Sequence, residues 1–155
     1  MKPFFTILIV LSFLSCSKEE NKEPEHLNLD LVLKELPQQW ELIKMTGSFQ
    51  GSETTGDEMF WQETYSFSED GTFTKTRIDE EGNTFTVSGQ FRITEDMETP
   101  SDKSLVLTYE EVNNIIGSCY NRPVEYLYYR NDENLLLSNW WACDGPGLFY
   151  KKIQE

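Results

Sequence analysis

From Pro37 onward, apolar and polar residues alternate in short runs, which is the period of β-strands that are buried on one face. Turn residues separate most of these runs. The pattern predicts eight strands, approximately over residues 39–49, 60–68, 72–78, 84–94, 104–110, 124–130, 135–140 and 148–153. Before them, Leu29, Leu33 and Leu36 follow one another at i, i+4 and i+7, the spacing of one helix face. We therefore expect an all-β domain that is preceded by a short N-terminal helix.

The clearest part of the pattern is a three-strand meander over residues 63–93, whose two turns contain Gly71 and Gly82. If each glycine takes the left-handed position of a three-residue hairpin loop, the pairing register follows. The first turn then pairs Phe67 with Phe73, Tyr65 with Lys75 and Glu63 with Arg77; the second pairs Arg77 with Phe85, Lys75 with Val87 and Phe73 with Gly89. This register places the aromatic rings on one face and a coat of threonine and serine on the other, and a one-residue slip would exchange the two faces.

The inward face of the meander carries charged residues beside its aromatic rings. One interpretation is a pocket in which Lys75 and Arg77 hold the anionic group of a ligand while the rings contact its apolar body. The other is a barrel end, where both cations reach water and Glu63 pairs with Arg77. The candidate ligand-binding residues are Tyr65, Phe67, Phe73, Lys75, Arg77, Phe85 and Phe91.

Two adjacent tryptophans, Trp140 and Trp141, precede a turn that contains Asp144. Successive residues on a strand face opposite sides of the sheet, so one ring is expected in the core and the other exposed or covered by a loop. An exposed tryptophan beside a rigid turn suits contact with a protein or a glycan. A lid over one barrel end, fastened by Cys143, is the alternative. Trp140, Trp141 and Asp144 are therefore candidates for an interaction loop.

The first sixteen residues form a separate segment. A positive start is followed by a mainly apolar run over residues 4–14, and then by Ser15 and Cys16. This run is shorter than the about 20 residues of a membrane-spanning helix, so we expect a secretory signal that is removed. Leu14-Ser15-Cys16 resembles the lipobox of bacterial lipoproteins, which implies that Cys16 becomes the acylated N-terminus. An ordinary secreted protein with a cysteine near its cleavage site is the alternative.

The residues after Cys16 are polar and charged, as in a flexible tether. Ser17-Lys18-Glu19-Glu20 resembles the lysine-plus-acid signal that sends lipoproteins of some Gram-negative bacteria to the outer surface of the outer membrane. The resemblance implies a lipid anchor in the outer membrane, on the cell surface or otherwise on the periplasmic face. The expected organisation is a signal peptide over residues 1–15, an acylated cysteine and tether over residues 16–26, and one domain over residues 27–155.

The chain is strongly acidic, with a formal charge of -14. Removal of the signal takes away Lys2 and leaves 12 basic and 27 acidic residues, a formal charge of -15. This excess opposes binding to nucleic acid, which requires cations against the phosphates, and adhesion to anionic lipid. With Cys16 acylated, Cys119 and Cys143 remain in an oxidising compartment, so a disulfide is expected ahead of a metal or redox role.

Enzymatic chemistry is not expected. The one histidine, His26, lies in the tether, which opposes a Ser-His-Asp arrangement and a zinc site built on histidines. Acid pairs such as Glu110-Glu111 would point to opposite faces of a strand, and we find no phosphate-binding glycine loop or EF-hand spacing. We expect no catalytic residue, no metal and no cofactor. The sequence leaves the oligomeric state undetermined.

Several of these features together resemble the lipocalin-like domain of bacterial surface lipoproteins: the lipid anchor, the short helix, Trp40 at the start of the first strand and the hairpin over residues 65–73. The resemblance covers roughly residues 36–153 and implies an eight-stranded antiparallel up-and-down barrel with a small interior. Gln38 stands where lipocalins proper have the glycine of Gly-x-Trp, and Lys151 or Lys152 matches their closing arginine only loosely. The resemblance therefore supports the fold more than ligand binding.

The expected function is that of a non-enzymatic envelope lipoprotein whose barrel binds a small, partly apolar or anionic ligand. One alternative is an interaction module that contacts a protein or a glycan through its tryptophan-bearing loops, and another is an inhibitor of an extracellular enzyme. An empty, solvent-connected interior lined by Tyr65, Lys75, Arg77 and Phe85 would favour the ligand-binding barrel. An interior filled by side chains, with Trp140 or Trp141 exposed, would favour the interaction module.

Overall fold

The computed structural model describes residues 33–95, 103–130 and 132–153, whose regular secondary structure consists mainly of antiparallel strands. The strands are β1 (Gln38–Thr46), β2 (Thr54–Thr55), β3 (Trp61–Phe67), β4 (Thr72–Asp79), β5 (Thr84–Glu95), β6 (Lys103–Tyr109), β7 (Val124–Arg130), β8 (Leu135–Ser138) and β9 (Gly147–Lys152). Two short 3-10 helices, η1 (Gly56–Glu58) and η2 (Asn139–Cys143), lie between strands. In this part of the chain, no helix has the length and apolarity needed to cross a membrane.

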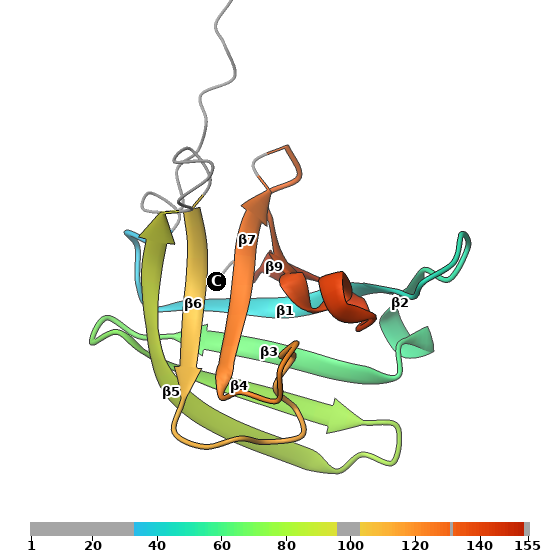
Figure 1. Ribbon diagram of the computed structural model, residues 1–155, viewed down its shortest axis with the longest axis horizontal. Helices are drawn as coiled ribbons and strands as arrows, with labels where there is room; N and C mark the ends of the chain where they lie inside the picture. The colour runs from blue at the N-terminus through green and yellow to red at the C-terminus, as the bar shows by residue number, and fades with distance from the viewer. Residues whose placement is uncertain (1–32, 96–102, 131, 154–155) are drawn as a thin grey trace, which may run out of the picture.

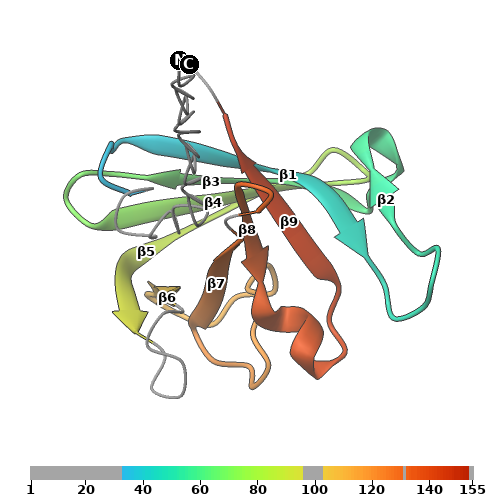
Figure 2. The same ribbon diagram turned by 90° about the horizontal axis from the view of Figure 1, so that it is seen from above.

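The sheet closes on itself (Figures 1 and 2). From β3 to β9 each strand pairs with the next one along the chain, β1 pairs with β3, and β1 also pairs with β9. The two-residue strand β2 lies outside this ring, at the edge of the sheet beside β1. The eight strands β1 and β3–β9 thus form a closed antiparallel up-and-down barrel, which confirms the architecture that the sequence pattern and the resemblance implied.

All eight predicted strands are present, but their ends and accompanying elements differ in part. The first strand ends at Thr46 because residues 47–52 turn back into β2, which was not predicted. The seventh ends at Ser138, where the chain enters η2. The predicted helix before Pro37 lies mostly outside the described residues.

The meander has the predicted register at all six pairs. Gly71 and Gly82 have φ angles of 81° and 83°, in the left-handed region that glycine favours. A Cβ added to Gly89 would overlap the carbonyl oxygen of Thr108 and come 2.9 Å from the Phe73 ring. Glycine at this position therefore lets β6 and an aromatic ring approach the backbone of β5 closely.

The core consists of inward-facing aromatic and aliphatic side chains from all sides of the barrel. Tyr65, Phe67 and Phe73 are at most 1% exposed. The Phe67 and Phe91 rings meet edge to face at 5.2 Å, and Phe73 meets Tyr109 in the same way at 4.9 Å, an arrangement that aromatic quadrupoles favour. The predicted aromatic lining is therefore present as a packed cluster.

Phe85 departs from that prediction, since its side chain is 38% exposed. It occupies the predicted register position opposite Arg77. However, pairing between β5 and β6 begins only at Gly89, so the first residues of β5 have β4 as their one strand neighbour. The inward face of this hairpin tip is not covered, and Phe85 does not line the barrel interior.

Candidate functional site

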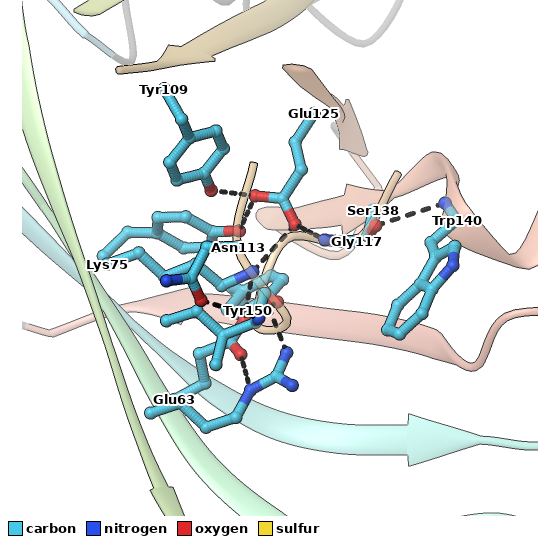
Figure 3. Close-up of polar contacts among 12 residues, drawn as sticks. Glu63, Lys75, Tyr109, Asn113, Gly117, Glu125, Ser138, Trp140 and Tyr150 are labelled. Atoms are coloured by element: carbon cyan, nitrogen blue, oxygen red, sulfur yellow. Dashed lines mark hydrogen bonds and ion pairs between the residues drawn. The ribbon is translucent and has the colours of Figure 1, made fainter. Parts of the chain in front are cut away.

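Four charged side chains meet inside the barrel (Figure 3). Lys75 Nζ lies 2.7 Å from Glu125 Oε1 and 3.1 Å from Glu63 Oε1, and Arg77 Nε lies 2.6 Å from Glu63 Oε2. All four residues are buried, and Lys75 is 0% exposed. We call Glu63, Lys75, Arg77 and Glu125 the interior ion cluster.

The interior ion cluster corrects both interpretations of the inward cations. Lys75 is fully enclosed and Arg77 is only 8% exposed, and internal carboxylates already neutralise both cations, so they are not available to hold an anionic ligand. The predicted pairing of Glu63 with Arg77 is confirmed. Two cations balance two carboxylates, which is the condition under which buried charges are tolerated.

Tyrosine hydroxyls complete the cluster. Tyr65 Oη donates to Glu125 Oε2 at 2.7 Å, Tyr109 Oη donates to the same oxygen, and Tyr150 Oη donates to Glu63 Oε1 at 2.5 Å. Burial first, and then the negative charges of the two glutamates, raise the pKa of each tyrosine well above its ordinary value. The three phenols therefore remain protonated donors, and their rings are buried in the barrel interior beside the ion cluster.

The pKa of Glu125 is lowered from its ordinary value of 4.5. Burial alone would raise the pKa, but the charge of Lys75 and hydrogen bonds from Lys75, Tyr109 and Tyr65 outweigh burial. The folded chain therefore holds this carboxyl ionised at a pH where the unfolded chain protonates it.

We expect the free energy of unfolding to fall as the pH drops below about 4.5, and the Glu125 contribution to be lost as the pH passes the lowered folded pKa. A glutamine at position 125 removes this titration, so Glu125→Gln should show a shallower loss over the same range. Urea denaturation at a series of pH values measures the slope. The exposed Glu133 is the control, and an equal change in slope for Glu133→Gln would contradict the assignment.

The interior ion cluster also holds the loop between β6 and β7. Arg77 Nη2 donates to the carbonyl of Ile115 at 3.1 Å, and the backbone N–H of Gly117 donates to Glu125. Ile115 and Ile116 are 2% and 7% exposed. The loop therefore packs into the barrel and is fixed there by buried charge.

The predicted disulfide is present between Cys119 and Cys143, whose Cα atoms lie 5.5 Å apart. It joins the β6–β7 loop to η2.

The conformation of η2 is defined by local contacts. The backbone N–H of Trp140 donates to the Ser138 hydroxyl, and Asp144 ends the helix with a φ of 66°. The indole of Trp140 lies so close to Gly145 that a Cβ at that position would collide with it. These contacts define the orientation of the loop that carries Trp141.

The prediction that one tryptophan is buried and the other exposed is confirmed, but the reason differs from the predicted one. Trp140 is partly buried against the core and Trp141 is 56% exposed. Strand alternation does not cause the difference, because both residues lie in η2.

A groove opens at the same end of the barrel, where β1 leaves β3. Pairing between these strands extends from Gln38 to Glu41, and the β1–β9 register then shifts at a bulge between Leu42 and Lys44. Bulges bend and twist a strand, and the rest of β1 pairs with β2 instead. The groove has a volume of about 600 Å³, and its lining includes Met45, Phe49, Glu53, Thr54, Phe60, Trp61, Asp144 and Pro146. We call it the aromatic groove.

A second hollow of about 290 Å³ adjoins the aromatic groove and is lined by Trp141 and Phe149. The two hollows share Gly47, Asp144 and Gly145 among their lining residues. The two hollows therefore adjoin, and together they extend from the β1–β2 loop to η2.

Two of the exposed rings flank β2 and η1, and the loop that carries Phe49 is held by hydrogen bonds. Phe49 and Phe60 are 74% and 63% exposed. The hydroxyl of Ser52 accepts from the Gly47 N–H at 2.8 Å and donates to the Phe49 carbonyl at 2.6 Å. Because the loop is held at both sides of Phe49, the phenyl ring stays in water without collapsing onto the core. Large exposed apolar patches of this kind mark interaction sites.

Sequence reasoning identified Trp141 and Asp144 at this end but missed Phe49 and Phe60. The sequence feature that could have revealed Phe49 and Phe60 is that these aromatic residues stand at the ends of the alternating apolar and polar runs, where no strand buries them. It also missed Glu125, whose signal was an acid at an inward-facing position of β7. Within the described residues, no group of three or more His, Cys, Asp or Glu side chains could hold a metal ion.

Comparisons with known proteins give the following. No protein-family model matches the chain, and no curated protein matches it significantly. A lipocalin-like protein from Bacteroides uniformis ATCC 8492 aligns with 14% identity and a TM-score of 0.49, covering 76% of this chain and 98% of that one. An uncharacterized protein from Bacteroides eggerthii DSM 20697 aligns with 11% identity and a TM-score of 0.47, covering 77% of this chain and 100% of that one. The barrel assignment rests on the strand pairing of this chain itself.

Proposed function

We propose that the protein is a non-enzymatic binding module of the cell envelope, anchored through lipid on Cys16, and that it binds at the aromatic groove instead of inside the barrel. The supporting observation is the contrast between the two places. The interior is packed and its charges are paired, whereas Phe49, Phe60 and Trp141 stand exposed around a groove of about 600 Å³. A volume in this range suits a ligand or an anchoring side chain of a partner.

The position of the groove fits an anchored protein. The chain enters β1 at Gln38 and leaves β9 at Lys152, and these two strand ends lie together because Trp40 pairs with Lys152. The groove lies at the opposite ends of the same strands, at Thr46 and Gly147, about 26 Å away along β1 and about 17 Å away along β9 at the rise of a β-strand. A tether from Cys16 would thus present the groove away from the membrane.

The lipid anchor is tested by a Cys16→Ser variant, which lacks the thiol that would be acylated. This variant is expected to leave the membrane fraction, and its retention there would contradict the anchor.

We expect the neutral apolar dye Nile red to bind the mature protein at the aromatic groove. A Phe49→Ser/Phe60→Ser variant should weaken the binding by about tenfold, since it removes most of the exposed ring surface. Fluorescence titration measures the affinity, and circular dichroism checks the fold.

The matched control is Phe85→Ser, which removes an exposed phenyl ring at the β4–β5 tip. This variant should bind the dye as the unchanged protein does. Equal affinities for all three proteins would place the dye elsewhere and contradict the proposed function.

A further inference from the structure

The rim of the aromatic groove is acidic. Glu53 and Asp144 belong to its lining. Two more acids, Asp57 and Glu58, lie in η1. In the sequence η1 stands between Thr54 and Phe60, and both of these residues line the groove. The nearby cation Lys44 is already engaged, because its Nζ lies 3.4 Å from Glu53 Oε2. Among the described residues that line the groove, an anionic occupant would therefore meet carboxylates and no lysine or arginine, whereas a cationic occupant would meet charges of opposite sign.

Aromatic rings at this end of the barrel already hold cations of the chain itself. Lys44 Nζ lies 4.2 Å from the centroid of the Phe149 ring, and Arg77 Cζ lies 4.1 Å from that of Trp61. These contacts use the attraction between a cation and the negative face of an aromatic ring. The exposed rings of Phe49, Phe60 and Trp141 offer the same kind of surface to a partner.

The shape of the site suits an extended peptide. Thr54 lines the aromatic groove and belongs to β2, which lies at the edge of the sheet and pairs with β1 alone among the described strands. A free strand edge offers backbone donors and acceptors to an added segment. The volume of about 600 Å³ also exceeds what a single amino group fills.

We propose that the aromatic groove binds a cationic, extended segment of a partner protein, in which lysine or arginine residues alternate with aliphatic ones. One cation of the segment pairs with Asp144, another shares the exposed carboxylate of Glu53 with Lys44, and both stack on the exposed rings. The aliphatic side chains contact Met45 and Pro146. The formal charge of -15 on the chain without its signal adds a long-range attraction for such a segment. This inference rests on the proposed function and specifies the chemistry of its partner.

The test uses two end-blocked, fluorescent octapeptides, one alternating lysine with leucine and the other alternating glutamine with leucine. Fluorescence anisotropy with the mature protein should give an affinity about tenfold higher for the lysine peptide. The difference should shrink from 50 to 500 mM salt, since exposed charges are screened. Equal affinities for the two peptides would overturn the cationic partner.

Matched variants separate a local site from the overall negative charge. Glu53→Gln/Asp144→Asn should weaken binding of the lysine peptide by about tenfold, and asparagine tolerates the left-handed backbone at position 144. Glu35→Gln/Glu69→Gln removes the same charge at the opposite end of the barrel and should change the affinity less than about threefold. Equal losses in the two variants would show attraction by net charge alone and would overturn the inference.

The Phe49→Ser/Phe60→Ser variant separates this inference from the proposed function. If it weakens both peptides equally, the groove is a binding site but does not select cations, so only the inference fails. If it weakens neither peptide, the proposed function and the inference both fail.

Discussion

Replacing Lys75 with methionine is expected to lower the free energy of unfolding by about 3–5 kcal/mol, the cost of removing one partner from a buried ion pair. The ammonium contacts both Glu63 and Glu125 at the centre of the barrel. Methionine fills much of the same space, so the loss comes chiefly from a carboxylate left buried without its counter-charge. Urea denaturation followed by tryptophan fluorescence measures the change.

Lys44→Met provides the control, because Lys44 pairs with Glu53 at the partly exposed surface. Such pairs contribute about 0–1 kcal/mol. Adding Glu125→Gln to Lys75→Met should restore part of the lost stability, since the neutral amide is cheaper to bury than an unpaired carboxylate. If the variants of Lys75 and Lys44 lose the same stability, Lys75 is not buried between the carboxylates.

Phe73→Ala should cost about 3–5 kcal/mol, the range for a buried aromatic side chain truncated to alanine. Phe73 is 1% exposed, packs against Phe67 and Tyr109, and covers Gly89. Thermal denaturation measures the loss as a lowered melting temperature.

Phe85→Ala removes the same ring from a position that is 38% exposed. Its cost should therefore stay below about 1 kcal/mol, as for most surface substitutions. An unchanged melting temperature for Phe73→Ala would contradict the register of the meander.

The meander could be predicted because its information is local. Gly71 and Gly82 determine two tight turns, and strict alternation then assigns every side chain between them to a face. The ends of β1 could not be predicted in this way. They depend on the bulge after Leu42 and on closure against β9, which lies more than one hundred residues later in the chain.

The candidate site was predictable only in part, for the same reason. The Glu63–Arg77 pair follows from the register of one hairpin. Glu125 meets Lys75 across the barrel from a strand 50 residues away, so the sequence alone did not distinguish a paired cluster from a ligand pocket. The exposure of the Phe85 side chain likewise depends on where β6 begins to pair with β5, which the local pattern does not show.

The aromatic groove depends on tertiary structure throughout. Phe49 and Phe60 lie where strand alternation ends, and Asp144 comes from the loop before β9. Closure of the barrel brings these segments together. Their common feature in the sequence is the presence of aromatic residues next to turn residues, a pattern that does not reveal which loops become neighbours.

Chemical-shift mapping of the isotope-labelled mature protein, titrated with the alternating lysine–leucine peptide, distinguishes binding at the aromatic groove from binding in the barrel interior. We expect the perturbed amides to cluster at residues 45–61 and 141–147, while those of Glu63, Lys75 and Glu125 stay unchanged. Perturbations centred on the interior ion cluster, with the groove unaffected, would contradict binding at the groove.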